Sequence, residues 1–441
     1  MWANNGILAL SFVVNLVCIS TNSFVQAFPS SILPTEESPS WICSRSRCYN
    51  YNKKTSLCLV QPRSSSWACT TTSISKKGLN QVDVSQVDEP MVDGYDLTSP
   101  REWMEYLEKK EGNGGAYTVL RCDIGKLHER SHGGIETRVW GKGFHVDRIA
   151  NSYSKMVAKE GTVRDDSNAM STDRSFAIQR THIILDALIK DAMHQVRVDE
   201  GSMVEGQCKT IMLTVLWTQA QSPIDQPCPD ILVRGHSFCN NIAVIPQDYN
   251  PAPISATIAL PNVDTSESLV GRYDFIPEAK LSSWCQKRKT LESRFKQGDG
   301  EVILARESCG SDKNMEWELL EGLTSNLFVV YKDGSIRTTA EGILHGYARD
   351  LIIRAAANIG IDVIYEPPTL SDCKNGLWDE MFFASSIRLL IPVDCLRTPN
   401  YTSSTSSPFE VVWEQDETSV LEMNKRTKIW NILYSDILTT I

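Results

Sequence analysis

The sequence lacks several features that would place it in a common class of protein. No two of its 13 cysteines are separated by two residues, which argues against a zinc ribbon and against a thioredoxin-like redox motif. Lys and Arg (44) are outnumbered by Asp and Glu (54), so the chain has no general excess of positive charge for binding a nucleic-acid backbone. We find no internal repeats. The chain has 441 residues, of which 41% are hydrophobic and 22% charged, and it is therefore long and apolar enough for two or three globular domains.

Histidine is also scarce, with seven residues, yet one stretch matches the HExxH pattern of zinc proteases: His128-Glu129-Arg130-Ser131-His132. That chemistry requires both histidines on one face of a continuous helix. Gly133 and Gly134 follow immediately and would end such a helix, and no other histidine stands at ligand spacing. We therefore interpret the stretch as a polar loop and expect no metal site.

The N-terminal segment is typical of a targeting sequence rather than of a folded domain. Residues 6–18 are apolar but too few to span a bilayer comfortably, and Val25-Gln26-Ala27 has small residues where signal peptidase requires them. This pattern predicts a signal peptide over residues 1–27. The first five residues carry no Lys or Arg, however, and a signal anchor is the alternative.

Residues 28–97 are expected to be a transit peptide and disordered linker. Residues 28–80 are rich in Ser and Thr and contain seven Lys or Arg against two acidic residues. A signal peptide followed by such a stretch resembles the bipartite presequence of algae with secondary plastids. We expect a plastid location without a stable membrane anchor after processing; the secretory pathway, a mitochondrion or a secreted disordered tail are the alternatives. The eight cysteines beyond residue 97 are scattered and are expected to be mostly buried thiols in a reducing compartment.

Hydrophobic periodicity predicts two mixed α/β domains, 98–265 and 266–441. Ser99 can cap a helix that begins at Pro100. A second helix should begin near Val146, and Glu307–Trp317 should form a surface hairpin or loop. Helices are further expected at 177–196, 344–359 (ended by Gly360) and from 418, and strands at 117–120, 137–140, 211–217, 231–234, 242–245, 256–260, 301–305, 327–331, 362–365, 380–383, 389–393 and 411–413.

Four segments of the second half together resemble a known family. They are Lys280 followed by the strand Glu301–Leu304, the octapeptide from Glu321 to Phe328 (EGLTSNLF), the element Ile343–Arg349 (ILHGYAR), and Asp379–Ser386 (DEMFFASS) with Pro392-Val393. They are similar to the motifs of fold type IV pyridoxal-phosphate enzymes, the class IV aminotransferase family. The resemblance covers about residues 115–395. It implies a two-domain α/β fold with pyridoxal 5′-phosphate in the cleft between the domains.

The resemblance gives two residues a chemical role. Lys280 corresponds to the Schiff-base lysine that forms an aldimine with the cofactor and later moves protons, whereas Lys287 and Lys289 would fall inside the following helix. Glu321 corresponds to the glutamate beside the pyridine nitrogen, which stays protonated and lets the ring accept electrons. The simpler reading of Glu321 is a surface residue that opens a turn.

The remaining matched residues correspond to the cofactor's phosphate site. Arg148, in Phe144–Ile149 (FHVDRI), matches an arginine whose guanidinium fork suits two phosphate oxygens, although a single helical arginine is usually a solvated charge. The N-terminus of the helix at Gly346, Tyr347 and Ala348 would present backbone N–H groups to the phosphate. Ser386 matches a phosphate-contacting hydroxyl, with Ser385 beside it; alternatively, both simply belong to a buried strand.

Some residues depart from the family pattern and leave the reaction open. Ala348 stands where relatives often have Thr, and Cys285 stands where branched-chain aminotransferases have a tyrosine five residues after the lysine. D-amino-acid aminotransferases and aminodeoxychorismate lyases also lack that tyrosine. We expect an aminotransferase that moves an amino group between an amino acid and a 2-oxo acid and works as a homodimer. An aminodeoxychorismate-type lyase of folate synthesis and a catalytically silent homologue are the alternatives.

Overall fold

The computed structural model describes residues 98–112, 114–125, 135–159, 167–198, 208–219, 231–240, 252–260, 276–295, 299–309, 315–400, 408–415 and Ile429. The expected targeting segments, the HExxH stretch, the strand at 242–245 and nearly all of the helix from 418 lie outside these residues. In the described part of the chain, no helix combines the length and apolar character that crossing a membrane would require. Nor do the described residues contain three potential metal ligands in one group.

The strands of the described residues form two sheets. The smaller sheet has the order β2-β1-β3-β4 and is antiparallel throughout. Its strands are β1 (Ala116–Gly125), β2 (Glu136–Val139), β3 (Cys208–Gln219) and β4 (Ile231–Asn240).

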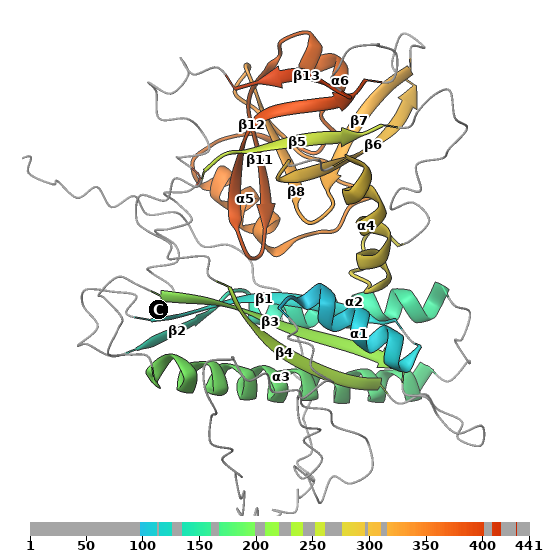
Figure 1. Ribbon diagram of the computed structural model, residues 1–441, viewed down its shortest axis with the longest axis vertical. Helices are drawn as coiled ribbons and strands as arrows, with labels where there is room; N and C mark the ends of the chain where they lie inside the picture. Colours follow the sequence, from blue (N-terminus) through green and yellow to red (C-terminus); the bar gives the residue numbers. More distant parts are fainter. Residues whose placement is uncertain are drawn as a thin grey trace, which may run out of the picture. The chain divides into compact units, whose positions relative to one another are not determined.

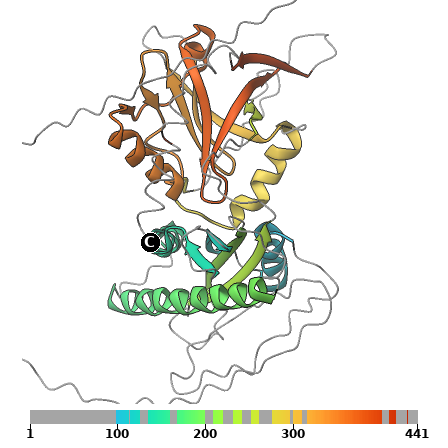
Figure 2. The ribbon, with the colours of Figure 1, turned by 90° about the vertical axis from the view of Figure 1, so that its left-hand side faces the viewer.

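Helices cover both faces of the smaller sheet. The long helix α3 (Ser167–Val198) lies along one face (Figures 1 and 2), where it shares an apolar core with α2 (Lys142–Lys159) and β1. Helix α1 (Pro100–Glu111) packs on the opposite face through Trp103, Met104 and Leu107. Ser99 caps α1 by accepting a hydrogen bond from the Glu102 amide, which confirms the expected helix start. Helix α2 begins at Lys142, four residues before the expected start near Val146, so it includes His145 in its first turn.

The larger sheet contains nine described strands and closes on itself. Its path is β10-β9-β8-β11-β12-β5-β6-β7, with β13 beside β12, and β7 also pairs with β8. The strands are β5 (Ile254–Ala259), β6 (Glu301–Cys309), β7 (Met315–Gly322), β8 (Asn326–Tyr331), β9 (Ile336–Arg337), β10 (Val363–Ile364), β11 (Trp378–Ser385), β12 (Leu389–Pro399) and β13 (Phe409–Glu414). The pair that completes the ring of strands is Glu321 with Asn326.

Three helices accompany the larger sheet: α4 (Ser283–Phe295), α5 (Tyr347–Asn358) and α6 (Leu370–Lys374). Helix α5 packs against the sheet through buried Ala348, Ile352, Ala355 and Ala356. It ends before Gly360, which adopts a left-handed φ of 69°, as the sequence predicted. The mixed α/β fold class is thus confirmed.

Strand β5 and the β6–β7 hairpin bear on two expectations from the sequence. Strand β5 precedes the expected domain boundary near residue 265, yet it pairs in parallel with β6 and β12 of the larger sheet. The domain limits themselves stay a prediction. Residues 307–309 and 315–317 extend the antiparallel pairing of β6 with β7, so the expected insertion lengthens a hairpin.

Candidate active site

Lys280 is the last residue of the loop 276–280 that leads toward α4, and it is partly buried. Its neighbours Ala279 and Leu281 are buried in the core of the smaller sheet. The Lys280 backbone amide donates a hydrogen bond to Ser152 Oγ of α2 at 3.0 Å, and its carbonyl oxygen accepts one from the Tyr117 amide of β1 at 2.9 Å. The backbone of Lys280 is therefore fixed on both sides, and the residue is partly buried rather than fully exposed.

The two rival lysines lie in α4, as expected. The side chain of Lys289 is 61% exposed and pairs with Glu105 of α1 at 3.6 Å. An exposed, paired ammonium has no environment that would favour its neutral, nucleophilic form. This placement favours Lys280 over Lys289 as the reactive amine.

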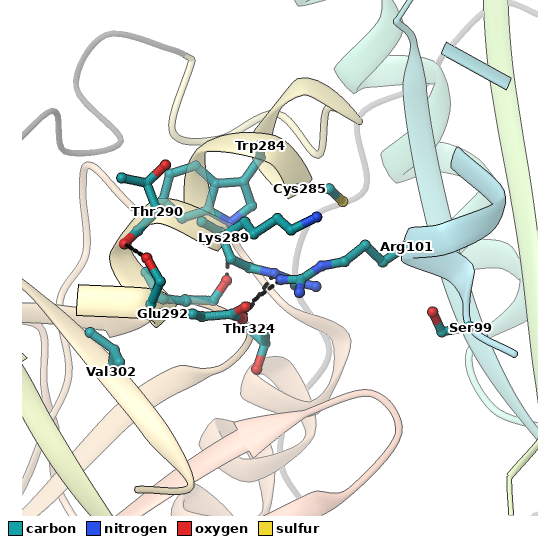
Figure 3. A network of polar contacts seen from close by, with 12 residues as sticks. Ser99, Arg101, Trp284, Cys285, Lys289, Thr290, Glu292, Val302 and Thr324 are labelled. Carbon is teal, nitrogen blue, oxygen red and sulfur yellow. Dashed lines mark hydrogen bonds and ion pairs between the residues drawn. The ribbon is translucent and has the colours of Figure 1, made fainter. Parts of the chain in front are cut away.

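Helix α4 is tied to its surroundings by a polar network (Figure 3). Arg101 of α1 forms an ion pair with Glu292 at 2.5 Å, and Arg288 pairs with the same carboxylate at 3.3 Å. At the other end of α4, the indole N–H of Trp284 donates to the Leu323 carbonyl at 3.0 Å. Because Leu323 follows Glu321 by two residues, this bond links the segment after Lys280 to the segment after Glu321.

Glu321 is 2% exposed and is the penultimate residue of strand β7. Its two carboxylate oxygens accept hydrogen bonds from the Leu344 amide at 3.2 and 3.3 Å. The side-chain amide of Asn326 also donates to Glu321, at 3.3 Å, and to the Leu344 carbonyl at 2.6 Å. The carboxylate is thus held in one orientation, and the surface-turn reading of Glu321 does not fit its burial.

The segment after Leu344 leads into α5, which begins at Tyr347 rather than at Leu344 as expected. Gly346 is the N-cap residue, and no side chain caps it. A Cβ on Gly346 would overlap the side-chain oxygen of Asn326, so only glycine fits here without displacing that amide. The first N–H groups of a helix have no intrahelical acceptor, so an uncapped start backed by glycine can bind an anion.

Tyr347 and Ala348 follow the N-cap and differ in their surroundings. Ala348 is buried in the core under α5, so its side chain gives nothing to a ligand and only its backbone can. The Tyr347 ring packs against α2, with ring centroids 5.5 Å from Phe144 and 5.6 Å from His145. This contact places the α5 N-terminus beside the helix that carries Arg148.

Arg148 is 9% exposed and donates hydrogen bonds to Thr118 Oγ1 and to His145 Nδ1, both at 2.8 Å. Because a guanidinium cannot accept a hydrogen bond, Nδ1 of His145 must be the acceptor, which leaves the imidazole neutral. Burial lowers the pKa of His145, and the positive charges of Arg148 and Lys280 lower it further. Arg148 and Lys280 are therefore close enough for both charges to act on one buried imidazole.

Ser385 and Ser386 lie at the end of β11, which pairs with β8 through Ala384 and Asn326. Ser385 Oγ accepts the Arg388 amide at 3.1 Å within the tight turn to β12. Leu389 closes this turn with a φ of 58°, a left-handed conformation that costs a leucine about 1 kcal/mol or more. Arg121 of β1 donates to the Ile387 carbonyl at 2.6 Å, so the turn is also held by the smaller sheet.

Contacts connect several of the residues singled out from the sequence. Arg148 donates a hydrogen bond to His145, and Tyr347 packs against the same histidine and so joins the α5 N-terminus to α2. Gly346 lies against Asn326, which in turn donates to Glu321 and pairs with the residue before Ser385. The charge of Lys280 acts on the imidazole of His145. A phosphate, a basic ring nitrogen and a carbonyl carbon would each find the donor, carboxylate or amine they require. The residues present thus fit pyridoxal phosphate.

Sequence reasoning assigned no role to three groups that build this arrangement. Asn326 belongs to the quoted octapeptide, and its position five residues after Glu321 could have indicated it. Tyr117 and the buried pair of Arg121 with Asp123 come from β1, and the pair has 2.9 Å between Nε and Oδ2. Trp140 and Thr210 donate hydrogen bonds to the same aspartate. Nothing in the local sequence of β1 indicates that it reaches segments 160 residues or more away.

Comparison with known proteins gives one family and several relatives. Residues 185–395 match the family model described as "Amino-transferase class IV". A stretch of 77 residues is 36% identical to a protein of Methanocaldococcus jannaschii named "Putative branched-chain-amino-acid aminotransferase". That stretch covers 17% of this chain and 26% of the archaeal protein, so the chain aligns with about a quarter of the relative's length.

Solved structures share less sequence with this chain than the archaeal relative does. A branched-chain aminotransferase of Thermoproteus uzoniensis with norvaline has a TM-score of 0.44 at 15% identity and covers 76% of this chain and 88% of its own. A structure described as a hypothetical aminotransferase of Mycobacterium tuberculosis, in its PLP-bound form, has a TM-score of 0.43 at 14% identity, covering 79% and 96%.

The family match contains Lys280, Glu321, the α5 N-terminus and both serines, whereas Arg148 precedes it and is placed by its contacts alone. Residues 185–395 are thus similar to the class IV aminotransferase family, and this match supports the resemblance that the sequence motifs indicated.

Proposed function

We propose that the protein is a pyridoxal-phosphate-dependent aminotransferase that moves an amino group between an amino acid and a 2-oxo acid. The observation that supports this proposal is the buried Glu321 carboxylate, which is held by Asn326 beside the uncapped start of α5 at Gly346. Tyr347 of that helix start packs against His145, which accepts a hydrogen bond from Arg148. A carboxylate, a helix start and a guanidinium are thus contributed by segments that are far apart in sequence.

Each residue has a defined task in this reaction. Arg148 and the backbone N–H groups at Tyr347 and Ala348 would hold the phosphate, with the hydroxyls of Ser385 and Ser386 as further donors. Glu321, oriented by Leu344 and Asn326, would hold a proton on the ring nitrogen. When bound, the cofactor supplies an electron sink that stabilises the carbanion left when the substrate's α-proton is removed.

Lys280 would accept that α-proton and later donate a proton to complete the transfer of the amino group. A general base of this kind works best when its amine is partly deprotonated near neutral pH. Lys280 is partly buried, and its charge and that of Arg148 both act on the buried imidazole of His145.

The test is a set of half-reactions on purified protein reconstituted with pyridoxal phosphate. Amino acids, including branched-chain, acidic and D-forms, are added one at a time, and formation of the 2-oxo acid is measured together with the cofactor spectrum. We expect at least one amino acid to give a stoichiometric 2-oxo acid, and Lys280→Ala to abolish this while Lys289→Ala retains it.

Two other results would contradict the proposal. Release of pyruvate from aminodeoxychorismate, with no amino acid half-reaction, would identify a lyase. A Lys280→Ala protein that converts amino acids at the wild-type rate would show that Lys280 is not the reactive amine. We further propose that the protein acts as a homodimer, which the family resemblance implies and sedimentation of the reconstituted protein tests.

A further inference from the structure

Tyr117 lies directly against the segment that carries the reactive lysine. The Tyr117 amide donates to the Lys280 carbonyl at 2.9 Å, and Ser282 and Gly115 exchange two more hydrogen bonds, of 2.8 and 2.9 Å. The start of β1 and residues 280–282 therefore behave as a short antiparallel pair. This pairing fixes where the Tyr117 side chain lies relative to Lys280.

The Lys280 ammonium lies over the face of the Tyr117 ring. The Lys280 ammonium is 4.9 Å from the centroid of the Tyr117 ring, inside the distance at which a cation is attracted to an aromatic face. Tyr117 is 3% exposed, so the ring has little freedom to leave this position. Water does not compete strongly for the ammonium on that side, because the buried ring covers it.

The hydroxyl of Tyr117 is held by α4. Cys285 Sγ lies 3.7 Å from the phenol oxygen, within hydrogen-bonding distance for sulfur. Burial alone would lower the pKa of Arg288, yet it is raised overall because Tyr117, Cys285, Glu292 and Glu301 act on its charge together. The phenol therefore belongs to the polar surroundings of α4, while its ring supports the lysine.

Charged and titratable groups approach Lys280 from each packed element. Helix α2 contributes His145 and Arg148, α4 contributes Arg288 through Tyr117, and Glu278 lies on the lysine's own loop. Of these groups, the Tyr117 ring lies directly against the Lys280 ammonium, which is 4.9 Å from its centroid, and an aromatic face attracts a cation.

We propose that Tyr117 is a positioning residue for Lys280: its ring holds the Lys280 amine in place and its hydroxyl anchors that ring to α4. The inference rests on the proposed function, because the position of the amine matters for the reaction only if Lys280 is the reactive lysine. The contact itself, however, exists without cofactor and can be tested in its absence.

The experiment measures the reactivity of Lys280 in cofactor-free protein. Trace acetylation at a series of pH values, read by mass spectrometry of the Lys280 peptide, gives the pH midpoint at which this amine becomes reactive. Tyr117→Met and Tyr117→Leu remove the ring, and Tyr117→Phe keeps the ring but not the hydroxyl. Tyr106→Leu is the matched control, since Tyr106 packs in the same apolar cluster but faces Lys110.

We expect the midpoint for Lys280 to fall by about half a unit to one unit when the ring is removed, the size of a partly buried cation–π contact. Tyr117→Phe should stay near the wild-type midpoint, and Tyr106→Leu should not change it. In reconstituted protein, Tyr117→Met should lower kcat more than it raises KM.

An unchanged midpoint in both ring-removing variants would overturn the inference. A shift of equal size in Tyr106→Leu would do the same, because it would indicate general loosening of the cluster. If Tyr117→Leu does not fold, Tyr117→Met and Tyr117→Phe carry the comparison, since both preserve most of the side-chain volume. Activity retained by Lys280→Ala would refute the proposed function but leave these midpoints meaningful, so the two failures are distinguishable.

Discussion

Gly346 offers the sharpest test of how the site is built. It is the N-cap of α5, and a Cβ at this position would overlap Asn326 Oδ1. Its φ of −83° is open to any residue, so backbone strain does not enter the comparison. A Gly346→Ala substitution therefore probes one contact, the one between the helix start and the Asn326 amide.

The expected cost follows from the bonds that the Asn326 amide would lose on moving away. Its bond to the Leu344 carbonyl is between neutral groups and contributes about 1 kcal/mol, and its bond to the Glu321 carboxylate contributes about 1.5–3 kcal/mol. If both are lost, Gly346→Ala should lower the free energy of unfolding by about 2–4 kcal/mol. It should also weaken cofactor binding, because the helix start and Glu321 both shift.

The assay is urea unfolding of reconstituted protein, together with titration of cofactor-free protein with pyridoxal phosphate. Gly143→Ala in the first turn of α2 is the control, because a Cβ there meets nothing within 4 Å. It should be neutral or stabilise by up to about 1 kcal/mol, as alanine does in a helix. If Gly346→Ala matches wild type in both measurements, Asn326 does not depend on the missing Cβ and the reasoning is refuted.

Three further predictions concern pH, the buried ion pair and the N-terminal segment. Burial lowers the pKa of His236 to about 4. The unfolded chain therefore binds a proton on this residue near pH 6.5 and the folded chain does not, so stability should decline as pH falls from about 6.5 to 4, by at most about 3 kcal/mol. His236→Phe should flatten this part of the urea-unfolding profile, and an unchanged slope would contradict the assignment. Asp123→Ala should destabilise by about 3–5 kcal/mol because it leaves the Arg121 charge buried without its 2.9 Å partner, whereas replacing both residues by leucine should restore much of the loss; equal losses in both variants would argue against the ion pair as the cause. Residues 1–97 fused to a fluorescent protein should direct it to a secondary plastid, and residues 28–97 alone should not; retention of both fusions in the cytosol would rule out a bipartite presequence.

Local rules were sufficient for much of the fold. Ser99 followed by Pro100 starts α1, and Gly360 follows the end of α5, because capping depends on residues within one turn of the helix end. Alternating or apolar runs predicted most strands of the larger sheet, although β7, β9 and α6 were not predicted. The site residues were predicted from the resemblance of short motifs to a known family, which the sequence alone can show; their roles stay a prediction.

The sequence by itself determined the helix caps, most of the strands and the motifs from which the site residues are predicted, but only the tertiary structure decided what surrounds those residues. Helix α5 starts at Tyr347 rather than at Leu344 because the backbone at Gly346 is extended, with a ψ of 148°. The Leu344 amide before it is instead bonded to the Glu321 carboxylate, 23 residues earlier in the chain. Tyr117 reaches Lys280 across more than 160 residues through a two-strand pairing that no local pattern encodes. The physical reason is the same in both cases: a buried polar or charged group takes its partner from whichever segment folding brings near, and distance along the chain does not limit that choice.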